Sequence, residues 1–192
     1  MKFKIVLLSC LIFSSCLKSQ DCPENINLVP MYGEVKKCPE QIEIDNAFFA
    51  DCDKQFENRK SAAEYYIQSA WNSFYKNDDV TSMKRFNQAW LLDKKNADVY
   101  WGFGNLLGKK GEYEKSIKFF DLSKQLNPNN AKFYVSSSTS YGQIFFKTKD
   151  QKFLDKAIED LKKSISLDNS NAQTYANLTA AYSYLTEKDS AQ

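Results

Sequence analysis

The feature that most constrains the fold of this 192-residue chain is a short phrase that recurs at a nearly fixed spacing. Asparagine followed by alanine, with a tyrosine three residues after the alanine, occurs at residues 96–100, 130–134 and 171–175. The first two copies are 34 residues apart, and the next two are 41 apart, which is 34 plus an insertion of seven. A period of this length predicts a stack of similar units rather than one globular core.

Other positions keep the same register. Ala63 and Tyr66 lie 34 residues before Ala97 and Tyr100, so four units are marked. Small residues recur seven positions after the alanine, where they would let two helices approach closely, and large apolar residues and leucines recur further on. The columns are Ala70, Gly104, Ser138 and Thr179; Phe86, Phe120 and Leu161; and Leu92, Leu126 and Leu167.

The unit at residues 97–130 predicts two helices. Tyr100, Phe103 and Leu107 recur at helical spacing within residues 97–109. The glycine-containing stretch 108–111 interrupts that pattern, and a second apolar stripe follows over 113–126. Pro128 then ends the second helix, because proline cannot continue an α-helix. One such hairpin cannot bury its apolar face alone, so neighbouring hairpins must stack.

This unit resembles the tetratricopeptide repeat. The resemblance covers about residues 60–192 and implies an all-α fold, a right-handed superhelical solenoid of antiparallel helix pairs. It would contain about three units plus a terminal capping helix within residues 61–192, divided at about 63–96, 97–130, 131–171 and 172–192. The residues that carry the match are Tyr100, Phe103, Gly104, Leu107, Gly111, Tyr113, Ser116, Phe120, Ser123 and Pro128.

Two units depart from the pattern. The seven extra residues of the third unit are expected within residues 144–152, as a longer hairpin loop with one or both helices extended. The fourth unit supplies only a first helix, over about residues 172–185, which would cap the solenoid. Its flank is not very polar for a cap, so it could also pair with another molecule.

Residues 1–15 have the pattern of a signal peptide: Lys2 and Lys4, and then an apolar run too short to span a bilayer. The tetrad that ends at Cys16 resembles a bacterial lipobox, which implies lipidation of Cys16 and stable anchoring by several acyl chains. The tetrad ending at Cys10 matches better but leaves a very short apolar run. Ordinary cleavage near Ser19 or Gln20 would give a secreted soluble protein. The lipobox predicts an exported, membrane-anchored lipoprotein of the cell envelope, facing the periplasm.

The segment before the repeats divides into two parts. Residues 16–40 read as a lipid-anchor tether and loop, and residues 41–60 as an amino-terminal capping helix that packs on the first hairpin. Disulfides persist in exported proteins. Pairing of Cys22 with Cys38 is the first expectation and pairing of Cys38 with Cys52 is the rival, with the remaining thiol buried in the core.

Composition excludes several classes of function. The chain has no histidine, which removes the commonest general base and zinc ligand. Loss of Lys2 and Lys4 with the signal lowers the basic residues from 26 to 24, against 24 acidic residues, so the mature chain carries no net charge. Nucleic acid is therefore not an expected partner.

Alternating charges over residues 149–163 predict a solvated helix face. No cofactor, metal site or catalytic residue is expected.

What remains is a surface for contact. The resemblance implies that the first helices line a concave groove that holds a peptide, and aromatic side chains are frequent anchors at such interfaces. Trp71, Phe74 and Trp101 could instead be covered by neighbouring helices. Some members of the family grip an acidic tail with lysines and asparagines; here Asn105 is kept, but Trp101 and Ser136 occupy two other clamp positions, so that function is not expected. The groove residues are Trp71, Phe74, Tyr75, Trp101, Asn105, Lys109, Thr139, Gln143 and Tyr184.

The sequence therefore predicts a non-catalytic protein–protein interaction scaffold or assembly factor of the bacterial cell envelope. Its partner would be a protein or peptide, and its membrane contact would be the lipid anchor alone. Two alternatives stay open. The chain could be a structural subunit that associates through its carboxy-terminal edge, or it could be an accessory regulator of an envelope enzyme.

Overall fold

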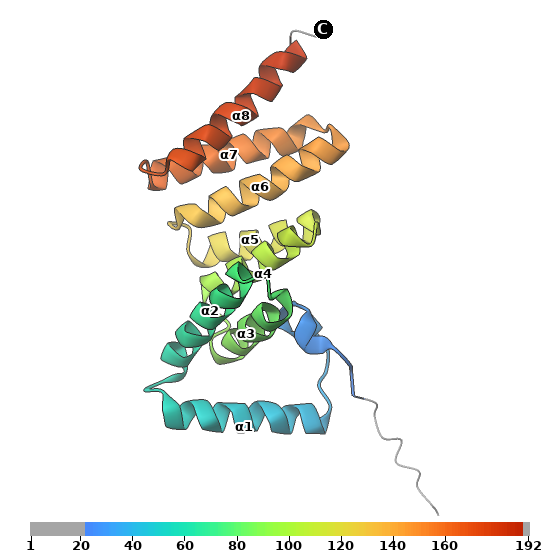
Figure 1. Ribbon diagram of the computed structural model, residues 1–192, viewed down its shortest axis with the longest axis vertical. Coiled ribbons are helices and arrows are strands. Elements are labelled where there is room, and N and C mark those ends of the chain that lie inside the picture. The colour runs from blue at the N-terminus through green and yellow to red at the C-terminus, as the bar shows by residue number, and fades with distance from the viewer. Residues whose placement is uncertain (1–21, 190–192) are drawn as a thin grey trace, which may run out of the picture.

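The computed structural model describes residues 22–189, with side chains through residue 185. Within this range the chain forms eight α-helices and two short 3-10 segments, and no strand. Figure 1 shows the helices stacked in chain order from the amino-terminal to the carboxy-terminal end. The expected all-α solenoid is confirmed, with three helical hairpins and a last single helix. The helices are α1 (Pro39–Gln55), α2 (Arg59–Tyr75), α3 (Asp79–Leu92), α4 (Ala97–Lys109), α5 (Tyr113–Leu126), α6 (Ala131–Thr148), α7 (Gln151–Leu167) and α8 (Ala172–Asp189).

The recurring asparagine starts the first helix of each unit. The side chains of Asn96 and Asn130 accept a hydrogen bond from the backbone N–H two residues on, at 3.0 and 3.1 Å. Asn171 accepts one from the N–H of Thr174 at 3.3 Å. Each bond satisfies an amide that the first turn of a helix leaves without a partner. The repeated phrase therefore fixes where α4, α6 and α8 begin.

In α4 and α6 the recurring tyrosine ties the helix to the turn before it. The hydroxyl of Tyr100 donates to the carbonyl of Lys94 at 2.7 Å, and the hydroxyl of Tyr134 donates to the carbonyl of Pro128 at 3.0 Å. Both bonds span six residues, and the two bonds are 34 residues apart along the chain. The same contact thus sets the entry angle of two successive units.

Close packing explains the small residues of α4. A Cβ atom added to Gly104 would lie 2.4 Å from the ring of Phe120 in the same hairpin. One added to Gly102 would lie 2.2 Å from the ring of Phe86 in the preceding hairpin. Both phenylalanines are fully buried. The small residue at the Gly104 position therefore lets α4 and α5 of one hairpin pack closely. Gly102 lets α4 pack closely on α3 of the preceding hairpin.

The seven inserted residues of the third unit extend both helices, as expected, but the expected longer hairpin loop is wrong. Helix α6 has 18 residues where α4 has 13, and α7 has 17 where α5 has 14. The turn between α6 and α7 has two residues, whereas the turn between α4 and α5 has three. The two helices therefore gain five and three residues and the turn loses one, which accounts for all seven inserted residues. Helix extension satisfies more backbone groups than an open loop would.

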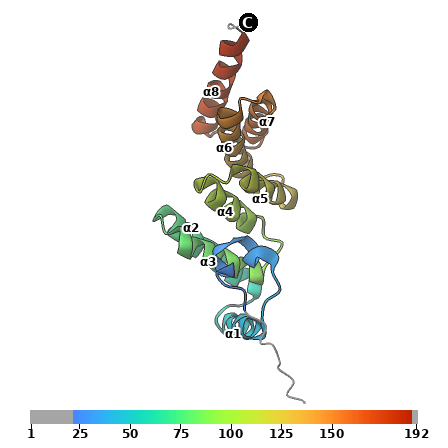
Figure 2. The same ribbon diagram turned by 90° about the vertical axis from the view of Figure 1, so that its right-hand side faces the viewer.

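The amino-terminal helix differs from the expected cap. The expected range was residues 41–60, whereas α1 covers Pro39–Gln55. At the other end of the chain, α8 extends past the expected residue 185 to Asp189. Figures 1 and 2 show α1 set apart from the stacked hairpins. It contacts α2 through the rings of Phe48 and Tyr66, whose centroids are 5.3 Å apart, and through the guanidinium of Arg59, which donates to the Asp53 carboxylate at 3.0 and 2.9 Å.

The leader segment (residues 22–37), rather than α1, covers the first hairpin. It contains the 3-10 segments η1 (Ile26–Leu28) and η2 (Pro30–Glu34), and both pack on α3. The fully buried side chain of Asn87 in α3 donates to the carbonyls of Asn27 at 3.1 Å and Val29 at 2.9 Å. Residues 31–34 all have positive φ, a conformation that is costly for residues other than glycine and must be held by its surroundings.

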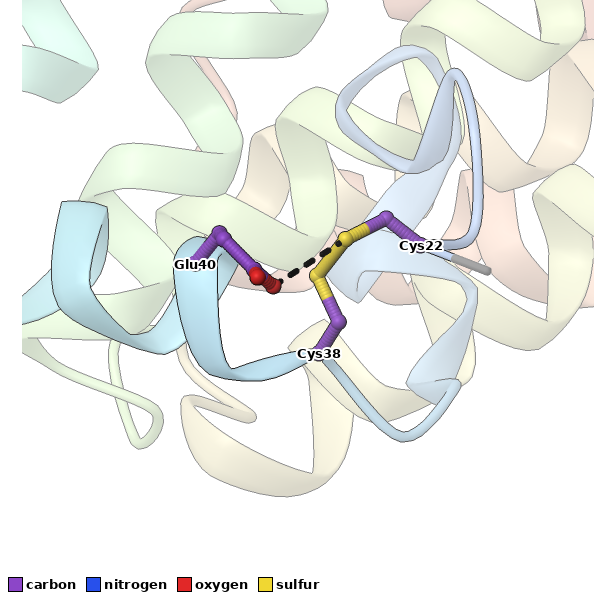
Figure 3. Close-up of side chains that lie close together, drawn as sticks. All are labelled: Cys22, Cys38 and Glu40. Atoms are coloured by element: carbon purple, nitrogen blue, oxygen red, sulfur yellow. Dashed lines mark hydrogen bonds between the residues drawn. A yellow bond between two sulfur atoms is a disulfide. The ribbon is translucent and has the colours of Figure 1, made fainter. Parts of the chain in front are cut away.

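A disulfide joins Cys22 to Cys38, the first of the two expected pairings, with their Cα atoms 5.2 Å apart. It links the start of the leader segment to the start of α1. The carboxylate of Glu40 lies 3.5 Å from the Cys22 sulfur, as Figure 3 shows. Because a bridged sulfur carries no proton, this cluster offers a disulfide and not two thiolates. Cys52 is a free, buried thiol whose pKa is raised by burial.

The expected signal peptide, residues 1–15, and the expected lipid site, Cys16, lie outside the described residues. Among residues 22–189, no helix combines the length and the apolar composition that crossing a bilayer requires. Export and anchoring therefore stay predictions from the sequence.

Candidate functional site

The first helices and the second helices of the units lie on different sides of the stack. Figure 2 shows α4, α6 and α8 on one side, and α5 and α7 on the other. The residues expected to form a groove all belong to α2, α4, α6 and α8. We call the surface that these residues form the inner face.

A central cavity of about 350 Å³ opens on the inner face between α2, α4 and α6. Five of the nine expected groove residues line it, so the repeat register brings these five side chains together. Hydroxyl and amide groups of α4 and α6 face apolar rings across the cavity. Its lining is Phe74, Asn105, Gly108, Lys109, Tyr113, Phe120, Val135, Ser136, Thr139, Ser140 and Gln143.

A distal cavity of about 190 Å³ lies between α6, α7 and α8. It shares Thr139 and Gln143 with the central cavity, so the two cavities adjoin along α6. Tyr184, a sixth expected groove residue, lines its α8 side. Its lining is Ser138, Thr139, Gly142, Gln143, Phe145, Phe146, Leu154, Ala157, Leu161, Asn177, Ala180, Ala181 and Tyr184.

The two tryptophans and Tyr75 line neither of these cavities. Trp71 and Trp101 are half-buried against each other, with ring centroids 4.4 Å apart, and the Trp101 indole N–H donates to the Ser136 hydroxyl at 2.8 Å. Trp71 also contacts the buried ring of Phe86. They therefore serve both the core and the inner face. Tyr75 stacks on Trp71 and is 73% exposed, so its ring is accessible.

The one cation of the central cavity is already paired. The ammonium of Lys109 lies 2.7 Å from an Asp79 carboxylate oxygen and 2.9 Å from the amide oxygen of Asn77. It also lies 5.0 Å from the centroid of Phe74. The amide of Asn105 donates to the carbonyl of Trp101 at 2.7 Å. The inner face is therefore polar but close to neutral, and Lys109 is not set apart to bind an anion.

A partly buried ionic network joins the second and third hairpins, and none of its residues lines either cavity. The carboxylate of Asp160 in α7 accepts from the Ser137 hydroxyl and lies 3.3 Å from the ammonium of Lys124, which also pairs with Asp121 at 3.0 Å. Burial raises the pKa of Asp160, and Lys124 opposes that shift. The expectation that the charges of this helix are all solvated is wrong at Asp160. Asp160 lies three residues after Ala157 and four before Ser164, so it shares their buried face of α7. This helical spacing was the signal in the sequence that could have revealed it.

Asn87 is a second residue that sequence reasoning missed. It lies one turn after Met83 on the buried stripe of α3 and hydrogen-bonds the leader segment. A polar residue on an apolar stripe was the signal that could have revealed it.

A second polar cluster lies between the leader segment and α1. The ammonium of Lys37 pairs with the carboxylate of Asp45 and lies over the ring of Tyr32. Burial, followed by the charge of Asp45, raises the pKa of Tyr32.

Stacked antiparallel hairpins with small residues at the close contacts define a helical-repeat solenoid. Residues 97–130 match the family model described as tetratricopeptide repeat. This is the unit that carries the sequence resemblance. A comparison with curated proteins gave no match.

Solved structures share the fold at low sequence identity. The first TPR of Spaghetti (RPAP3), bound to the HSP90 peptide SRMEEVD, is 13% identical with a TM-score of 0.58, over 66% of this chain and 95% of that one. The Sgt2 TPR domain of Aspergillus fumigatus is 12% identical with a TM-score of 0.59, over 67% and 82%. The Yersinia enterocolitica chaperone SycD, in complex with a peptide of the translocator YopD, is 16% identical with a TM-score of 0.53, over 64% and 93%.

Proposed function

We propose that this chain is a non-catalytic interaction module that holds a segment of another protein on its inner face. The observation that carries this is the pair of adjoining cavities, lined by side chains from all four first helices. Aromatic rings there provide apolar contact, and Asn105, Thr139 and Gln143 provide hydrogen-bonding groups. Two of the similar solved structures hold peptides, which supports the same class of ligand here.

The chemistry of the cavities suits contact better than catalysis. Their ionisable side chains are Lys109, Tyr113 and Tyr184, and Lys109 is paired with Asp79. The serine and threonine hydroxyls have no histidine or carboxylate beside them in either lining, so nothing there would activate a nucleophile. We therefore assign no catalytic role to the site.

The proposal is tested by a pair of matched variants. Gln143→Arg places a cation at the boundary of the two cavities, whereas Gln125→Arg makes the same exchange on α5, outside both linings. Both glutamines are exposed, so neither change should affect folding. Partner proteins would be captured by crosslinking pull-down with the full chain as bait, and identified by mass spectrometry.

We expect Gln143→Arg to lower the yield of the main captured protein at least tenfold and Gln125→Arg to leave it unchanged. Circular dichroism would verify that both variants keep the helical fold. Equal capture by the two variants would show that the inner face is not the binding surface.

We also propose that the module works in the bacterial cell envelope, exported by residues 1–15 and anchored by lipid on Cys16. Three features of the amino-terminal sequence support this: its basic start, the short apolar run, and the lipobox-like tetrad that ends at Cys16. The disulfide is consistent with an oxidising compartment. Because one acyl chain anchors only weakly, the modification must carry more than one chain.

Replacing the cysteine tests the anchor. Cys16→Ser should give an unprocessed or soluble protein, whereas Cys10→Ser should be processed and retained like the parent. Membrane fractionation and the mass of the mature protein are the readouts. Normal membrane retention of Cys16→Ser would refute lipidation at this position.

An association through the carboxy-terminal edge is the second candidate. It is favoured by the exposed rings of Tyr175 and Tyr182 on α8, which are 43% and 40% accessible. Tyr182→Arg should then abolish association while Gln143→Arg leaves it intact. Size-exclusion chromatography and the same pull-down separate this candidate from binding at the inner face.

A further inference from the structure

The seven residues that break the repeat register build the wall of the distal cavity. Gln143 in α6 occupies the position of Lys109, where α4 ends, so residues 144–148 are the added turn of α6. Phe145 and Phe146 belong to this added turn, and both line the distal cavity. A unit of ordinary length would lack this wall. The insertion thus has a structural product on the inner face.

Helix α8 closes the other side of the cavity. The ring of Tyr184 lies 5.0 Å from that of Phe146 and 6.2 Å from that of Phe145, in edge-to-face geometry. Ala180 and Ala181 lie on the same face of α8 and leave space beside these rings. The cavity therefore has an aromatic wall on one side and an alanine wall on the other. Its floor is formed by Leu154, Ala157 and Leu161 of α7.

Among residues 22–185, whose side chains the structure describes, none of those lining this cavity is charged. Apart from the apolar groups, it offers hydroxyls and the amides of Gln143 and Asn177. Lys149 lies nearby, with its ammonium 5.9 and 5.8 Å from the ring centroids of Phe145 and Phe146. Lys149 is outside the lining, so a charged ligand group against these walls would lose part of its hydration with no opposite charge in the described lining to compensate. The cavity is therefore complementary to an uncharged apolar group.

Its size limits the occupant further. A volume of about 190 Å³ corresponds to roughly six water molecules at about 30 Å³ each. This is smaller than the cavities of about 300–1,000 Å³ that hold whole small molecules. A volume of this size accommodates one large side chain.

The adjoining central cavity sets the direction of the rest of the ligand. Thr139 and Gln143 line both cavities, so a segment that enters the distal cavity continues directly into the central one. On an extended peptide, side chains on the same side recur about every 6.6 Å, so one segment can place side chains in neighbouring cavities. The central cavity offers that neighbouring part of the segment aromatic rings and the amides of Asn105 and Gln143.

We propose that the distal cavity binds one large apolar side chain of an extended, uncharged protein segment whose neighbouring residues lie in the central cavity. The inference rests on the proposed function, because it assigns side-chain specificity to the same inner face. The paired Lys109 has no part in it, so a carboxylate-rich tail is not the expected ligand.

The probes are capped eight-residue peptides of glycine and serine that carry phenylalanine, aspartate or lysine at one central position. Their affinities for the mature full chain would be measured by calorimetry. Burial of the phenyl ring predicts that the phenylalanine peptide binds about ten- to a hundredfold more tightly than the other two. No binding of the phenylalanine peptide at about 1 mM, or equal affinities for all three, would overturn the inference.

Two exposed alanines of α8 provide a matched pair of variants. Ala180→Trp fills the distal cavity, because Ala180 lines it, whereas Ala176→Trp adds the same ring outside the lining. We expect Ala180→Trp to abolish the preference for phenylalanine and Ala176→Trp to keep it. Phe146→Ala, at a partly exposed ring, should weaken the preference without depending on a new side chain fitting.

The outcomes separate this inference from the proposed function. If Gln143→Arg abolishes partner capture but Ala180→Trp and Phe146→Ala leave the phenylalanine preference unchanged, the inner face binds and the distal cavity is not its anchor site. If none of these variants affects capture or peptide binding, the proposed function fails as well.

Discussion

At the scale of single residues, two glycines of the first helices have opposite surroundings. Gly104 faces the buried ring of Phe120, whereas a Cβ added to Gly142 would meet no atom within 4 Å. Both lie inside helices, where glycine costs about 0.5–1 kcal/mol relative to alanine. Packing alone therefore decides whether alanine is tolerated at each position.

Gly104→Ala should destabilise the fold by about 1–2 kcal/mol, because the strain of overpacking exceeds the gain in helix propensity. Gly142→Ala should stabilise it by about 0.5–1 kcal/mol. Urea denaturation followed by circular dichroism measures both. The same sign for the two changes would contradict the close packing of α4 on α5.

Asp160 gives a pH dependence whose sign is set by burial. Burial raises its pKa above the unfolded value, although Lys124 opposes this. The stability that it contributes is therefore fully present below the unfolded pKa, about 3.9, and is lost as pH rises through the folded pKa. Asp160→Asn removes this titration. The exposed carboxyl groups with lowered pKa act in the opposite direction in both proteins and cancel in the difference; they are Asp53, Asp78, Asp150 and Asp168.

The free energy of unfolding of the parent minus that of Asp160→Asn should therefore fall as the pH rises above the unfolded pKa of about 3.9. Urea titrations at a series of pH values measure it. A difference that rises with pH would mean that Lys124 and the Ser137 hydroxyl outweigh burial in setting the pKa of Asp160.

The positions that repeat were predictable from sequence, and the buried polar ones were not. Asn96, Tyr100 and Gly104 recur with a period, so their local roles in capping and packing could be inferred. Asn87 and Asp160 act through partners from distant segments, in the leader and on α5. Such partners are brought together by tertiary packing, which no local spacing encodes.

At the scale of elements, helix length was harder to predict than helix existence. The two-residue turn at Lys149 and Asp150 replaces the expected longer loop, because Lys149 adopts positive φ and Asp150 caps α7. The apolar stripe of Phe145 and Leu154 runs through the inserted residues, so both helices continue. The insertion could be counted from the sequence, but its conformation depended on packing against α8.

The leader segment depends on Asn87. Asn87→Ala leaves the carbonyls of Asn27 and Val29 without their donor, which should cost about 1–3 kcal/mol. Hydrogen exchange at residues 25–35 should accelerate, because the positive-φ turn is no longer held. Gln88→Ala, at the adjacent half-buried residue, is the control and should change neither value appreciably. Unchanged exchange in Asn87→Ala would mean that the disulfide holds the leader unaided.

At the scale of the whole molecule, stacking turns separate helices into one continuous surface. Each hairpin contributes a few side chains to the inner face, and register places Phe74, Asn105 and Gln143 beside one another although they are far apart in sequence. The resemblance predicted this assembly. It did not predict that Lys109 would be paired, and it left open whether the tryptophans would be covered, since both depend on side-chain contacts between units.

The most direct test of the central claim is a photo-crosslinking footprint of the bound partner. A photoreactive residue would replace, one at a time, exposed side chains on three surfaces of the full chain: Tyr75 and Gln143 on the inner face, Lys118 and Gln125 on α5, and Tyr182 on α8. We expect partner adducts from Tyr75 and Gln143 and none from the other three. Adducts confined to α5 or to Tyr182 would contradict binding at the inner face.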